Sequence, residues 1–360
     1  RLDLMKILIV SDHFNKGGVS YVIYQLVKEW SKNHELSLLF FEKTPLAYDD
    51  ICSNAYVEFI NTKALTPMRF LNKLINKIIY KYAIKKKLKQ YKPDIMISFK
   101  TKPNLFTLLA NKNIGIKHII CEHGFHLGEK SKKTNRLRRK LYPLATYLSV
   151  LTGEDFKYYS FVKNKIIMPN PLGVKKQIHT NDKENIILYA GRLEEEKAVD
   201  VFIKALSCIQ KDVLNKWKII IAGEGSLKKN LMELAKNLNL HIDFVGYIED
   251  LSFYYEKAKI LCLCSKQEGL PIVLIEAAFY ECARISSDYM GVNELIDDKN
   301  NGLLFKMGDF NDMALKISLL MQDENLRQKI VKKAKEKVES HKVESVMKKW
   351  DELFDMIKTT

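Results

Sequence analysis

The chain has 360 residues, of which 47% are hydrophobic and 28% charged, with only 15 glycines and 8 prolines. This composition excludes a disordered, collagen-like or low-complexity chain and predicts a globular protein with room for two domains. Lys and Arg number 59 against 43 Asp and Glu, a formal net charge of +16. Such an excess favours an anionic partner.

Apolar runs in the chain are of strand length, and none approaches the ~18–20 residues of a membrane-spanning helix. No charged start followed by an apolar stretch and a small-residue cleavage site is present. The six cysteines form no Cys-x-x-Cys pair, so a disulfide framework or a zinc site is not expected. We therefore expect a protein of the reducing cytosol without a bound metal.

Apolar runs alternate with amphipathic stretches along nearly the whole sequence. Strands are predicted near 6–11, 36–41, 94–98, 117–121, 146–150, 186–190, 217–222, 242–245, 260–264, 283–286 and 302–305. Helices are predicted near 18–32, 69–90, 103–111, 136–142, 194–210, 226–238, 251–257, 271–281, 309–322 and 324–357, the last broken near Ser340. Continuous apolar strands between helices indicate parallel sheets covered on both faces.

This alternation occurs once before and once after a proline-rich stretch at 169–173, which cannot continue a helix. We predict an α/β protein with two doubly wound domains facing a central cleft. The first domain is expected to span 1–168 and the second 169–340, and the helix at 341–360 should pack back on the first domain.

A glycine-containing turn follows the first strand of the N-terminal half. Gly17 and Gly18 stand directly before the helix expected from Val19. Glycine lets the backbone approach a ligand, and a helix N-terminus favours an anion. The spacing is not Gly-x-Gly-x-x-Gly, so it gives little support to a dinucleotide site, and a plain connection remains the alternative.

The strongest signal is the segment 265–276, which follows the strand at 260–264. Its loop carries Glu268, and Pro271 stands where a first helical residue is expected. Backbone N–H groups of the first turn would then face the cleft and suit a phosphate. Glu276 lies one to two turns inside the helix, so the two carboxylates can accept hydrogen bonds from sugar hydroxyls. The alternative is that both are solvated charges.

Two further loops end strands of the C-terminal half at the same predicted edge. Arg192 and Lys197 follow the strand at 186–190, and a cation pair in that position can clamp a diphosphate. The other loop, 222–226, contains Gly223 and Gly225 and follows the strand at 217–222. Ligands of open α/β sheets bind at the carboxyl ends of strands. A surface turn in which Lys197 pairs with its acidic neighbours is the alternative.

These residues together resemble the retaining glycosyltransferases of family 4, which have the GT-B fold of two Rossmann-like domains. The resemblance covers nearly the whole chain and rests on Gly-Arg-Leu…Lys at 191–197, Gly-x-Gly at 223–225 and Glu-Gly-Leu-Pro…Glu at 268–276. The usual glycine after the lysine is replaced by Ala198.

The resemblance implies a role for each matching residue. Arg192 and Lys197 would bind the donor diphosphate, Glu268 the donor sugar as a catalytic residue, and Glu276 the ribose. His123, in Cys-Glu-His-Gly at 121–124, would lie near the transferred sugar as a second catalytic residue. The remaining donor-binding residues would be Gly17, Gly18, Gly223, Glu224, Gly269, Leu270 and Pro271.

Within that family, the stretch 255–287 looks most like bacterial enzymes that extend undecaprenyl-diphosphate-linked glycans, especially the N-acetylgalactosamine transferases of N-glycan assembly. This resemblance implies a UDP-sugar donor, a lipid-linked acceptor, and front-face retention with no metal. The alternatives are a capsule or lipopolysaccharide glycosyltransferase with another donor and, less favoured, a nucleotide-sugar epimerase. A nucleic-acid-binding protein is disfavoured because the basic tracts lack interleaved aromatics, apart from Tyr80, Tyr82 and Tyr91, and lack a known binding motif.

Two segments of the N-terminal half carry the excess positive charge. Residues 69–92 hold nine Lys or Arg and residues 130–140 hold seven, neither with an acid. In the first, basic residues recur every four positions, with an apolar stripe through Ile78 and Tyr82 expected opposite. We expect a peripheral protein on the cytoplasmic face of the inner membrane, whose basic segments contact anionic lipids and the acceptor diphosphate; an ordinary solvated helix is the alternative. The residues assigned to this role are Arg69, Lys73, Lys77, Lys81, Lys85, Arg136, Arg138 and Arg139.

Overall fold

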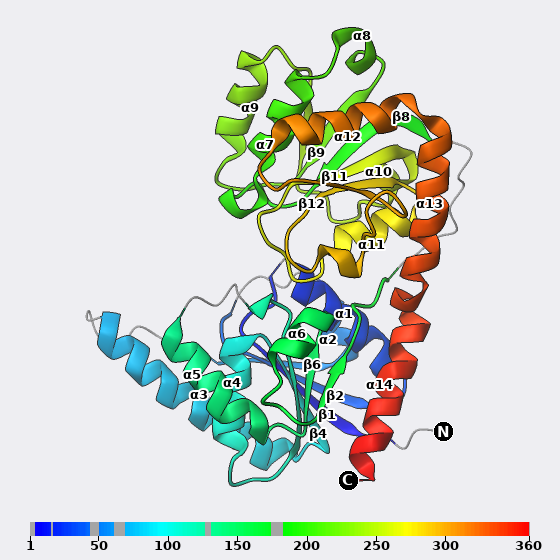
Figure 1. The fold of residues 1–360 in the computed structure, drawn as a ribbon. Helices are drawn as coiled ribbons and strands as arrows, with labels where there is room; N and C mark the ends of the chain where they lie inside the picture. The colour runs from blue at the N-terminus through cyan, green and yellow to red at the C-terminus, as the bar shows by residue number, and fades with distance from the viewer. Residues whose placement is uncertain are drawn as a thin grey trace. The chain divides into compact units, whose positions relative to one another are not determined.

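The computed structural model describes residues 4–15, 17–43, 50–60, 69–126, 131–173 and 183–359, without the side chains of 69–74. The chain divides into two compact units (Figure 1). The N-terminal unit comprises Arg1–Gly173 together with Val343–Thr360, and the C-terminal unit comprises Val174–Lys342.

The N-terminal unit is built on a seven-stranded parallel sheet in the order β3-β2-β1-β4-β5-β6-β7. The register pairs Ile9 with Leu38 on one side and with Ile97 on the other, so three apolar strands form the centre of the sheet. The strands are β1 (Lys6–Ser11), β2 (Glu35–Phe40), β3 (Tyr56–Phe59), β4 (Ile95–Phe99), β5 (Lys117–Cys121), β6 (Tyr147–Val150) and β7 (Lys165–Ile167).

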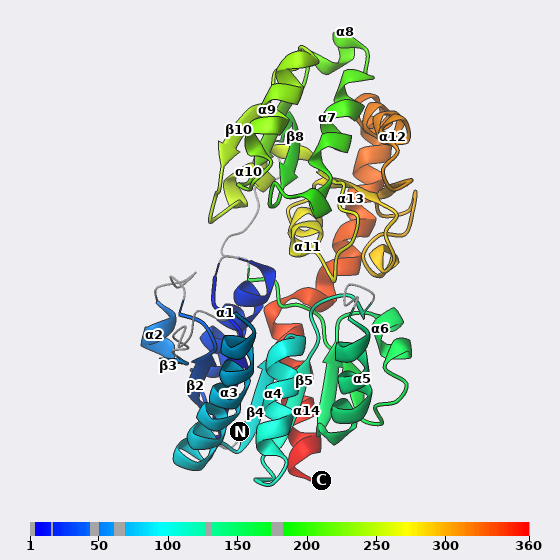
Figure 2. The same ribbon diagram turned by 90° about the vertical axis from the view of Figure 1, so that its left-hand side faces the viewer.

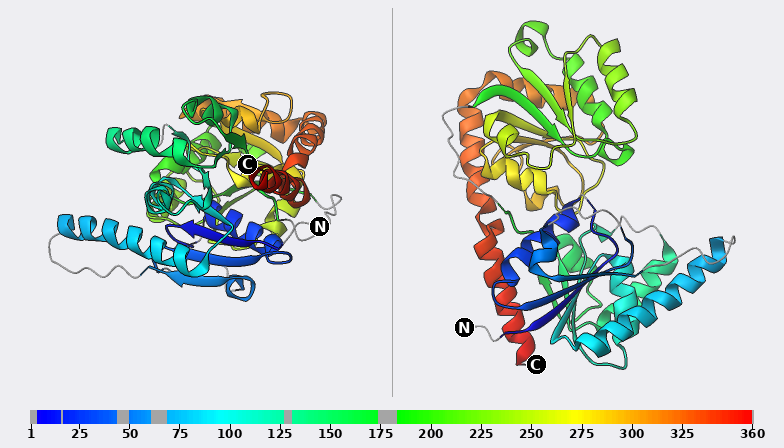
Figure 3. Two further views of the ribbon diagram at one scale, coloured as in Figure 1. Left: turned by 90° about the horizontal axis from the view of Figure 1, so that it is seen from below. Right: turned by 180° about the vertical axis from the view of Figure 1, so that it is seen from behind.

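Helices cover both faces of this sheet. On one face α3, α4 and α5 lie side by side (Figure 2), and α3 buries Tyr80, Ile84 and Leu88. On the other face α14 lies along α1 (Figure 3), where Trp30 and Trp350 meet edge to face at 5.2 Å. The helices are α1 (Gly18–Trp30), α2 (Ile51–Asn54), α3 (Arg69–Tyr91), α4 (Thr101–Asn111), α5 (Lys132–Leu141), α6 (Gly153–Tyr158) and α14 (Val343–Lys358), with a 3₁₀ turn η2 (Tyr142–Leu144).

The C-terminal unit has a six-stranded parallel sheet in the order β10-β9-β8-β11-β12-β13. Its strands are β8 (Glu184–Ala190), β9 (Lys218–Ala222), β10 (Asp243–Gly246), β11 (Ala258–Leu263), β12 (Ala283–Ser287) and β13 (Leu303–Phe305). Its helices are α7 (Val199–Ser207), α8 (Lys211–Leu214), α9 (Lys228–Asn237), α10 (Ser252–Lys257), α11 (Ile272–Phe279), α12 (Phe310–Gln322) and α13 (Glu324–Val338), with 3₁₀ turns η4 (Glu195–Lys197), η5 (Val292–Glu294) and η6 (Glu339–His341).

Both sheets reverse their strand order once, between β1 and β4 in the first unit and between β8 and β11 in the second. Ligands of such sheets bind outside the carboxyl ends of the strands at this reversal. The prediction of two doubly wound, Rossmann-like domains is therefore confirmed, and it identifies the edge of each unit at which to look for a site.

Some local predictions differ from the structure. The helix expected over 194–210 is divided into η4 and α7, because Ala198 between them adopts a left-handed conformation with φ 48°. Pro271 is the N-cap of α11, so the helix begins at Ile272, one position after the expected first helical residue. Among the strands and α-helices of the described residues, five short ones were not predicted: β3, β7, α2, α6 and α8. None of the helices in the described parts of the chain is both long and apolar enough to cross a membrane.

Candidate functional site

The loops after β8 and β11 bring a lysine and a carboxylate together at the strand-order reversal of the C-terminal unit. Lys197 Nζ forms an ion pair with Glu268 Oε1, although the two residues are 71 positions apart. Ser265 Oγ donates a hydrogen bond of 2.6 Å to the same oxygen. Each side chain of the pair is 15% exposed. A mostly buried charge pair that water still reaches can exchange partners when a charged ligand arrives.

Arg192 differs from Lys197 in its exposure. Its Nη2 bonds Glu196 Oε1 at 2.8 Å, and its side chain is 66% exposed. Lys197 does not pair with the acids before it, which contradicts the alternative of a surface turn neutralised by its own neighbours. The other two acids have their own partners: Glu195 is 3.1 Å from Lys266 Nζ, and Glu194 accepts from Ser226 N at 2.8 Å and Ser226 Oγ at 2.6 Å.

The glycines at 223 and 225 are required for contact between two loops. A Cβ at Gly223 would lie 1.9 Å from the carbonyl oxygen of Gly191, and one at Gly225 would lie 2.4 Å from that of Leu193. Leu193 N donates to Glu224 O at 2.9 Å, and the Glu224 carboxylate bonds Lys228 Nζ at 2.5 Å. This loop therefore supports the Arg192 segment by direct packing.

Glu276 lies on α11 and is partly buried. Tyr255 Oη donates to its Oε2 at 2.9 Å. Burial raises the pKa of Glu276 to about 7, and the Tyr255 hydrogen bond opposes that rise. Gly269, Leu270 and the N-cap residue Pro271 connect Glu268 to α11, so the positive end of the helix dipole lies at this edge.

Beneath α11, the structure contains buried groups that sequence reasoning missed. Arg284 is fully buried and donates to the carbonyl oxygens of Leu274, Leu295 and Asn301 at 3.0–3.1 Å. Burial lowers its pKa to about 10. Tyr289 is 3% exposed, and burial together with the Glu268 charge raises the pKa of its hydroxyl. Nothing in the local sequence marks an arginine on a strand as a support for a neighbouring helix.

At the strand-order reversal of the N-terminal unit, Lys100 contacts two residues of the loop after β1. Its Nζ lies 3.1 Å from Asp12 Oδ1 and 3.2 Å from His13 Nε2. Lys100 adopts a positive φ of 73°. Burial and the Lys100 charge lower the pKa of His13. Lys100 was not predicted, because a single lysine after a strand carries no motif.

Gly17 and Gly18 begin α1 on this same side of the sheet. Gly17 is the N-cap, with extended backbone at φ 170°. A Cβ at Gly17 would meet no atom within 4 Å, so packing within the described residues does not require glycine there. The assignment of this turn to donor binding remains a prediction.

His123 follows β5 at the same edge and packs at 5.2 Å against the ring of Phe99. Burial lowers the pKa of His123 to about 3, and the Lys100 charge acts in the same direction. His123 is consequently neutral at physiological pH. A neutral imidazole can donate one hydrogen bond and accept another.

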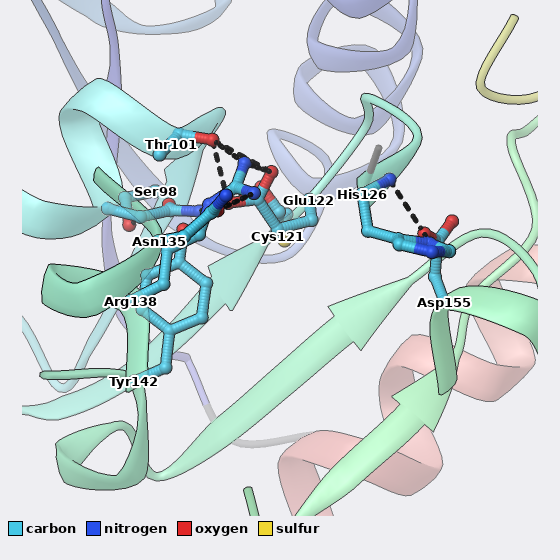
Figure 4. Close-up of polar contacts among 10 residues, drawn as sticks. Ser98, Thr101, Cys121, Glu122, His126, Asn135, Arg138, Tyr142 and Asp155 are labelled. Atoms are coloured by element: carbon cyan, nitrogen blue, oxygen red, sulfur yellow. Dashed lines mark hydrogen bonds and ion pairs between the residues drawn. The ribbon is translucent and has the colours of Figure 1, made fainter. Parts of the chain in front are cut away.

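The preceding residue, Glu122, is at the centre of a buried polar network (Figure 4). Arg138 Nη2 lies 3.6 Å from Glu122 Oε2, and Tyr142 Oη donates to Oε1. Thr101 Oγ1 donates to both carboxylate oxygens at 3.1 and 3.2 Å. Burial raises the pKa of Glu122, which the Arg138 charge opposes. The network ties α4 and α5 to the loop that carries His123.

This network corrects the prediction for Arg138. That side chain is 4% exposed, so it is unavailable to a lipid surface, because the helical period turns position 138 inward with Leu141. Arg136 and Arg139 of the same helix are exposed.

The exposed face of α3 also differs from the prediction in one respect. Lys77 and Lys81 are exposed and Lys85 partly so. Ile78 and Tyr82 are 65% and 70% exposed among these lysines, not on an opposite apolar stripe, because Tyr80, Ile84 and Leu88 form the buried face. The side chains of Arg69 and Lys73 lie outside the described residues.

Comparison with known families places two matches on the two units. Residues 16–153 match the family described as Glycosyltransferase Family 4, and residues 174–337 match the family described as glycosyl transferases group 1.

A curated relative covers the whole chain. It is the GalNAc-alpha-(1->4)-GalNAc-alpha-(1->3)-diNAcBac-PP-undecaprenol alpha-1,4-N-acetyl-D-galactosaminyltransferase of Campylobacter jejuni, 34% identical over 99% of each chain. Among solved structures, Anabaena HepE in complex with UDP superimposes with a TM-score of 0.81 at 16% identity, covering 98% of this chain and 100% of that chain. Staphylococcus aureus poly(ribitol-phosphate) alpha-N-acetylglucosaminyltransferase is 26% identical over 76% of this chain and 58% of its own.

Proposed function

The chain belongs to the family-4 glycosyltransferases of the GT-B fold, and we propose that it transfers a hexose or N-acetylhexosamine, with retention, from a UDP-sugar to an undecaprenyl-diphosphate-linked glycan. The ion pair of Lys197 with Glu268, at the strand-order reversal of the C-terminal unit, is the observation that carries the donor half. The acceptor half is supported by the full-length similarity to the Campylobacter jejuni enzyme, whose name specifies such an acceptor.

In the proposed donor complex, the diphosphate takes the place of Glu268 as the anion next to Lys197. Glu268 then becomes free to accept hydrogen bonds from sugar hydroxyls, with Ser265 still orienting it. Exposed Arg192 would add a second, bidentate contact to the diphosphate. Glu276 would accept hydrogen bonds from the ribose.

The two cations and the N-terminal end of α11 would neutralise the leaving diphosphate without a metal. Retention in this proposal follows from front-face attack, in which the acceptor hydroxyl gives its proton to the departing phosphate oxygen. Neutral His123, on the N-terminal unit, would hydrogen-bond the transferred sugar. The N-terminal unit would bind the acceptor.

The proposed membrane contact rests on the exposed face of α3. Lys77, Lys81 and Lys85 form a row beside the exposed side chains of Ile78 and Tyr82. Each basic residue near an anionic surface contributes about 1 kcal/mol, and an apolar side chain among lysines can enter the headgroup region. The mixed face therefore suits a peripheral, salt-sensitive contact with anionic lipid on the cytoplasmic side.

The test of the donor assignment is a thermal-shift screen of UDP- and GDP-sugars, followed by transfer of the stabilising sugar to an undecaprenyl-diphosphate-linked glycan. We expect Lys197→Ala and Arg192→Ala to raise the donor KM and lower kcat, and Glu268→Gln to bind UDP with little turnover. Lys236→Ala, on α9, is the matched control. Unchanged kinetics in both cation variants would contradict the assignment. A UDP-sugar epimer formed without acceptor would indicate the epimerase alternative.

The membrane contact is tested by flotation with anionic and neutral liposomes at low and high salt. We expect binding to anionic liposomes that salt weakens and that charge reversal of Lys77, Lys81 and Lys85 abolishes. Tyr82→Ser should weaken binding at both salt concentrations. Equal binding to both lipids, or none to either, would refute the contact and leave the transferase assignment unaffected.

A further inference from the structure

His126 is joined to Asp155 by two hydrogen bonds at the carboxyl edge of the N-terminal sheet (Figure 4). Asp155 Oδ1 accepts from the backbone N of His126 at 3.0 Å and lies 2.8 Å from its Nδ1. The other carboxylate oxygen accepts from Thr152 Oγ1 at 2.8 Å, and Thr152 caps α6. Asp155 is 3% exposed. The carboxylate is therefore fixed by three donors, and it fixes the imidazole in turn.

This arrangement assigns the protons of the imidazole. A carboxylate oxygen that faces Nδ1 accepts a hydrogen bond, so Nδ1 carries a proton and Nε2 is the nitrogen left for another partner. Nε2 has no hydrogen-bond partner among the described residues. His126 as a whole is 8% exposed.

The ring is also held against rotation. Tyr158 stacks on it with centroids 4.1 Å apart and an interplanar angle of 18°, and Phe125 lies at 4.3 Å. At the start of the segment 122–126, Glu122 is held by Arg138 and Tyr142. This segment, which contains His123 and His126, is therefore anchored at each of its ends by a contact with a buried carboxylate.

A histidine on the preceding strand shows what a structural role looks like in this unit. His118, on β5, is 1% exposed, its Nε2 lies 2.9 Å from Ser98 Oγ, and burial lowers its pKa to about 3. His118 therefore has a structural role in the core of the unit. His126 differs because a buried carboxylate orients its ring through Nδ1 and because it lies beyond the carboxyl end of the strand, not within it.

We propose that His126 Nε2 forms a hydrogen bond with a hydroxyl of the acceptor glycan, with Asp155 as the residue that positions the ring. The inference rests on the proposed function, in which the N-terminal unit binds the acceptor. Three positions after His123, and at the edge where ligands of parallel sheets bind, His126 would set the position of the sugar that receives the new residue. This is a contact with the acceptor and requires no proton transfer.

Two substitutions at His126 distinguish the role of Nδ1, which contacts Asp155, from the proposed role of Nε2. Asn places an amide near the Nδ1 position, so His126→Asn should keep the Asp155 contact and the melting temperature but lose the acceptor contact. We expect its acceptor KM to rise about tenfold, the scale of one hydrogen bond, with donor KM and acceptor-independent UDP-sugar hydrolysis unchanged. His126→Gln reaches the Nε2 position and should recover part of the acceptor affinity at lower stability. His241→Asn, on an exposed histidine of the other unit, is the control.

A second readout does not depend on turnover. In histidine-labelled protein, long-range ¹H–¹⁵N spectra should show His126 protonated at Nδ1, with assignment by the signals lost in His126→Asn. Addition of the acceptor named for the Campylobacter jejuni relative, made on a short prenyl chain, should shift the Nε2 resonance, whereas UDP alone should not.

An unchanged Nε2 resonance in the presence of saturating acceptor would overturn the proposal, as would wild-type acceptor KM in folded His126→Asn. If the wild-type protein transfers no sugar from any donor, the proposed function fails. The resonance titration would still report whether this glycan reaches His126.

Discussion

Glu276→Gln should stabilise the protein at alkaline pH and weaken its donor binding. The folded state raises the pKa of Glu276 from an ordinary value of 4.5 to about 7 because burial disfavours the charged carboxylate. Between these values the folded protein binds more protons than the unfolded chain, so its stability falls as pH rises through this window. Glutamine does not titrate, and its amide oxygen can still accept from Tyr255 Oη, so the variant avoids this loss.

The size of the effect follows from the two pKa values. Each pKa unit of difference between the folded and unfolded states is equivalent to about 1.4 kcal/mol. The rise from 4.5 to about 7 therefore lowers the free energy of unfolding of the wild type by about 3 kcal/mol at alkaline pH, where Glu276 is fully ionised. Between pH 5 and pH 8.5, the variant should gain about 2–3 kcal/mol over the wild type. For a unit of this size that gain corresponds to roughly 5–10 °C in melting temperature.

The assay is thermal unfolding of both proteins at pH 5 and pH 8.5, with Glu233→Gln on exposed α9 as the control. The donor KM is measured in parallel. We expect it to fall in the wild type as pH rises through 7, when the carboxylate ionises, and to be about tenfold higher in the variant because a charged hydrogen bond is lost. A melting-temperature difference that does not change with pH would refute the reasoning about burial.

Three further predictions concern stability. Lys197→Ala should lower the free energy of unfolding by about 1–3 kcal/mol because it leaves mostly buried Glu268 without its cation. In a double-mutant cycle measured by denaturant unfolding, adding Glu268→Gln should recover part of that loss. Simple additivity of the two effects would exclude coupling between the residues. Arg138→Met should lower the free energy of unfolding by about 2–4 kcal/mol, whereas Arg139→Met on the exposed side should change it by no more than about 0.5 kcal/mol. Similar losses in the two variants would contradict the role of Arg138 in the buried network. Ala198→Gly should raise the melting temperature by a few degrees, since glycine adopts φ 48° without a Cβ clash; a lower value would show that Ala198 is unstrained.

Short-range patterns predicted the central strands and the long helices of this protein. Buried parallel strands such as β1 and β8 must be apolar on both faces, so they appear as continuous apolar runs between amphipathic segments. The missed elements are short ones at the sheet edges or on the surface, including β3 and β7, which are marked weakly by local sequence because tertiary pairing supplies their stability.

The candidate site was predicted to a different degree in each unit. Lys197 and Glu268 were identified because their loops follow strands of one parallel sheet, whose carboxyl ends must share an edge. That Lys197 pairs with Glu268, and not with the acids beside it, depends on the order in which β8 and β11 lie in the sheet. Arg138 was misassigned because charge composition does not reveal which helix face is buried.

By itself, the sequence determined the two-domain α/β architecture and the edge of the C-terminal sheet at which Lys197 and Glu268 meet, because periodicity and spacing along the chain are local properties. The family was indicated by the resemblance of its motifs at 191–197, 223–225 and 268–276. The tertiary structure alone decided the partners of buried charges, including Glu122 with Arg138 and Asp155 with His126. A charge can be buried only where donors from distant segments converge to replace its water, and that convergence is a property of the folded chain.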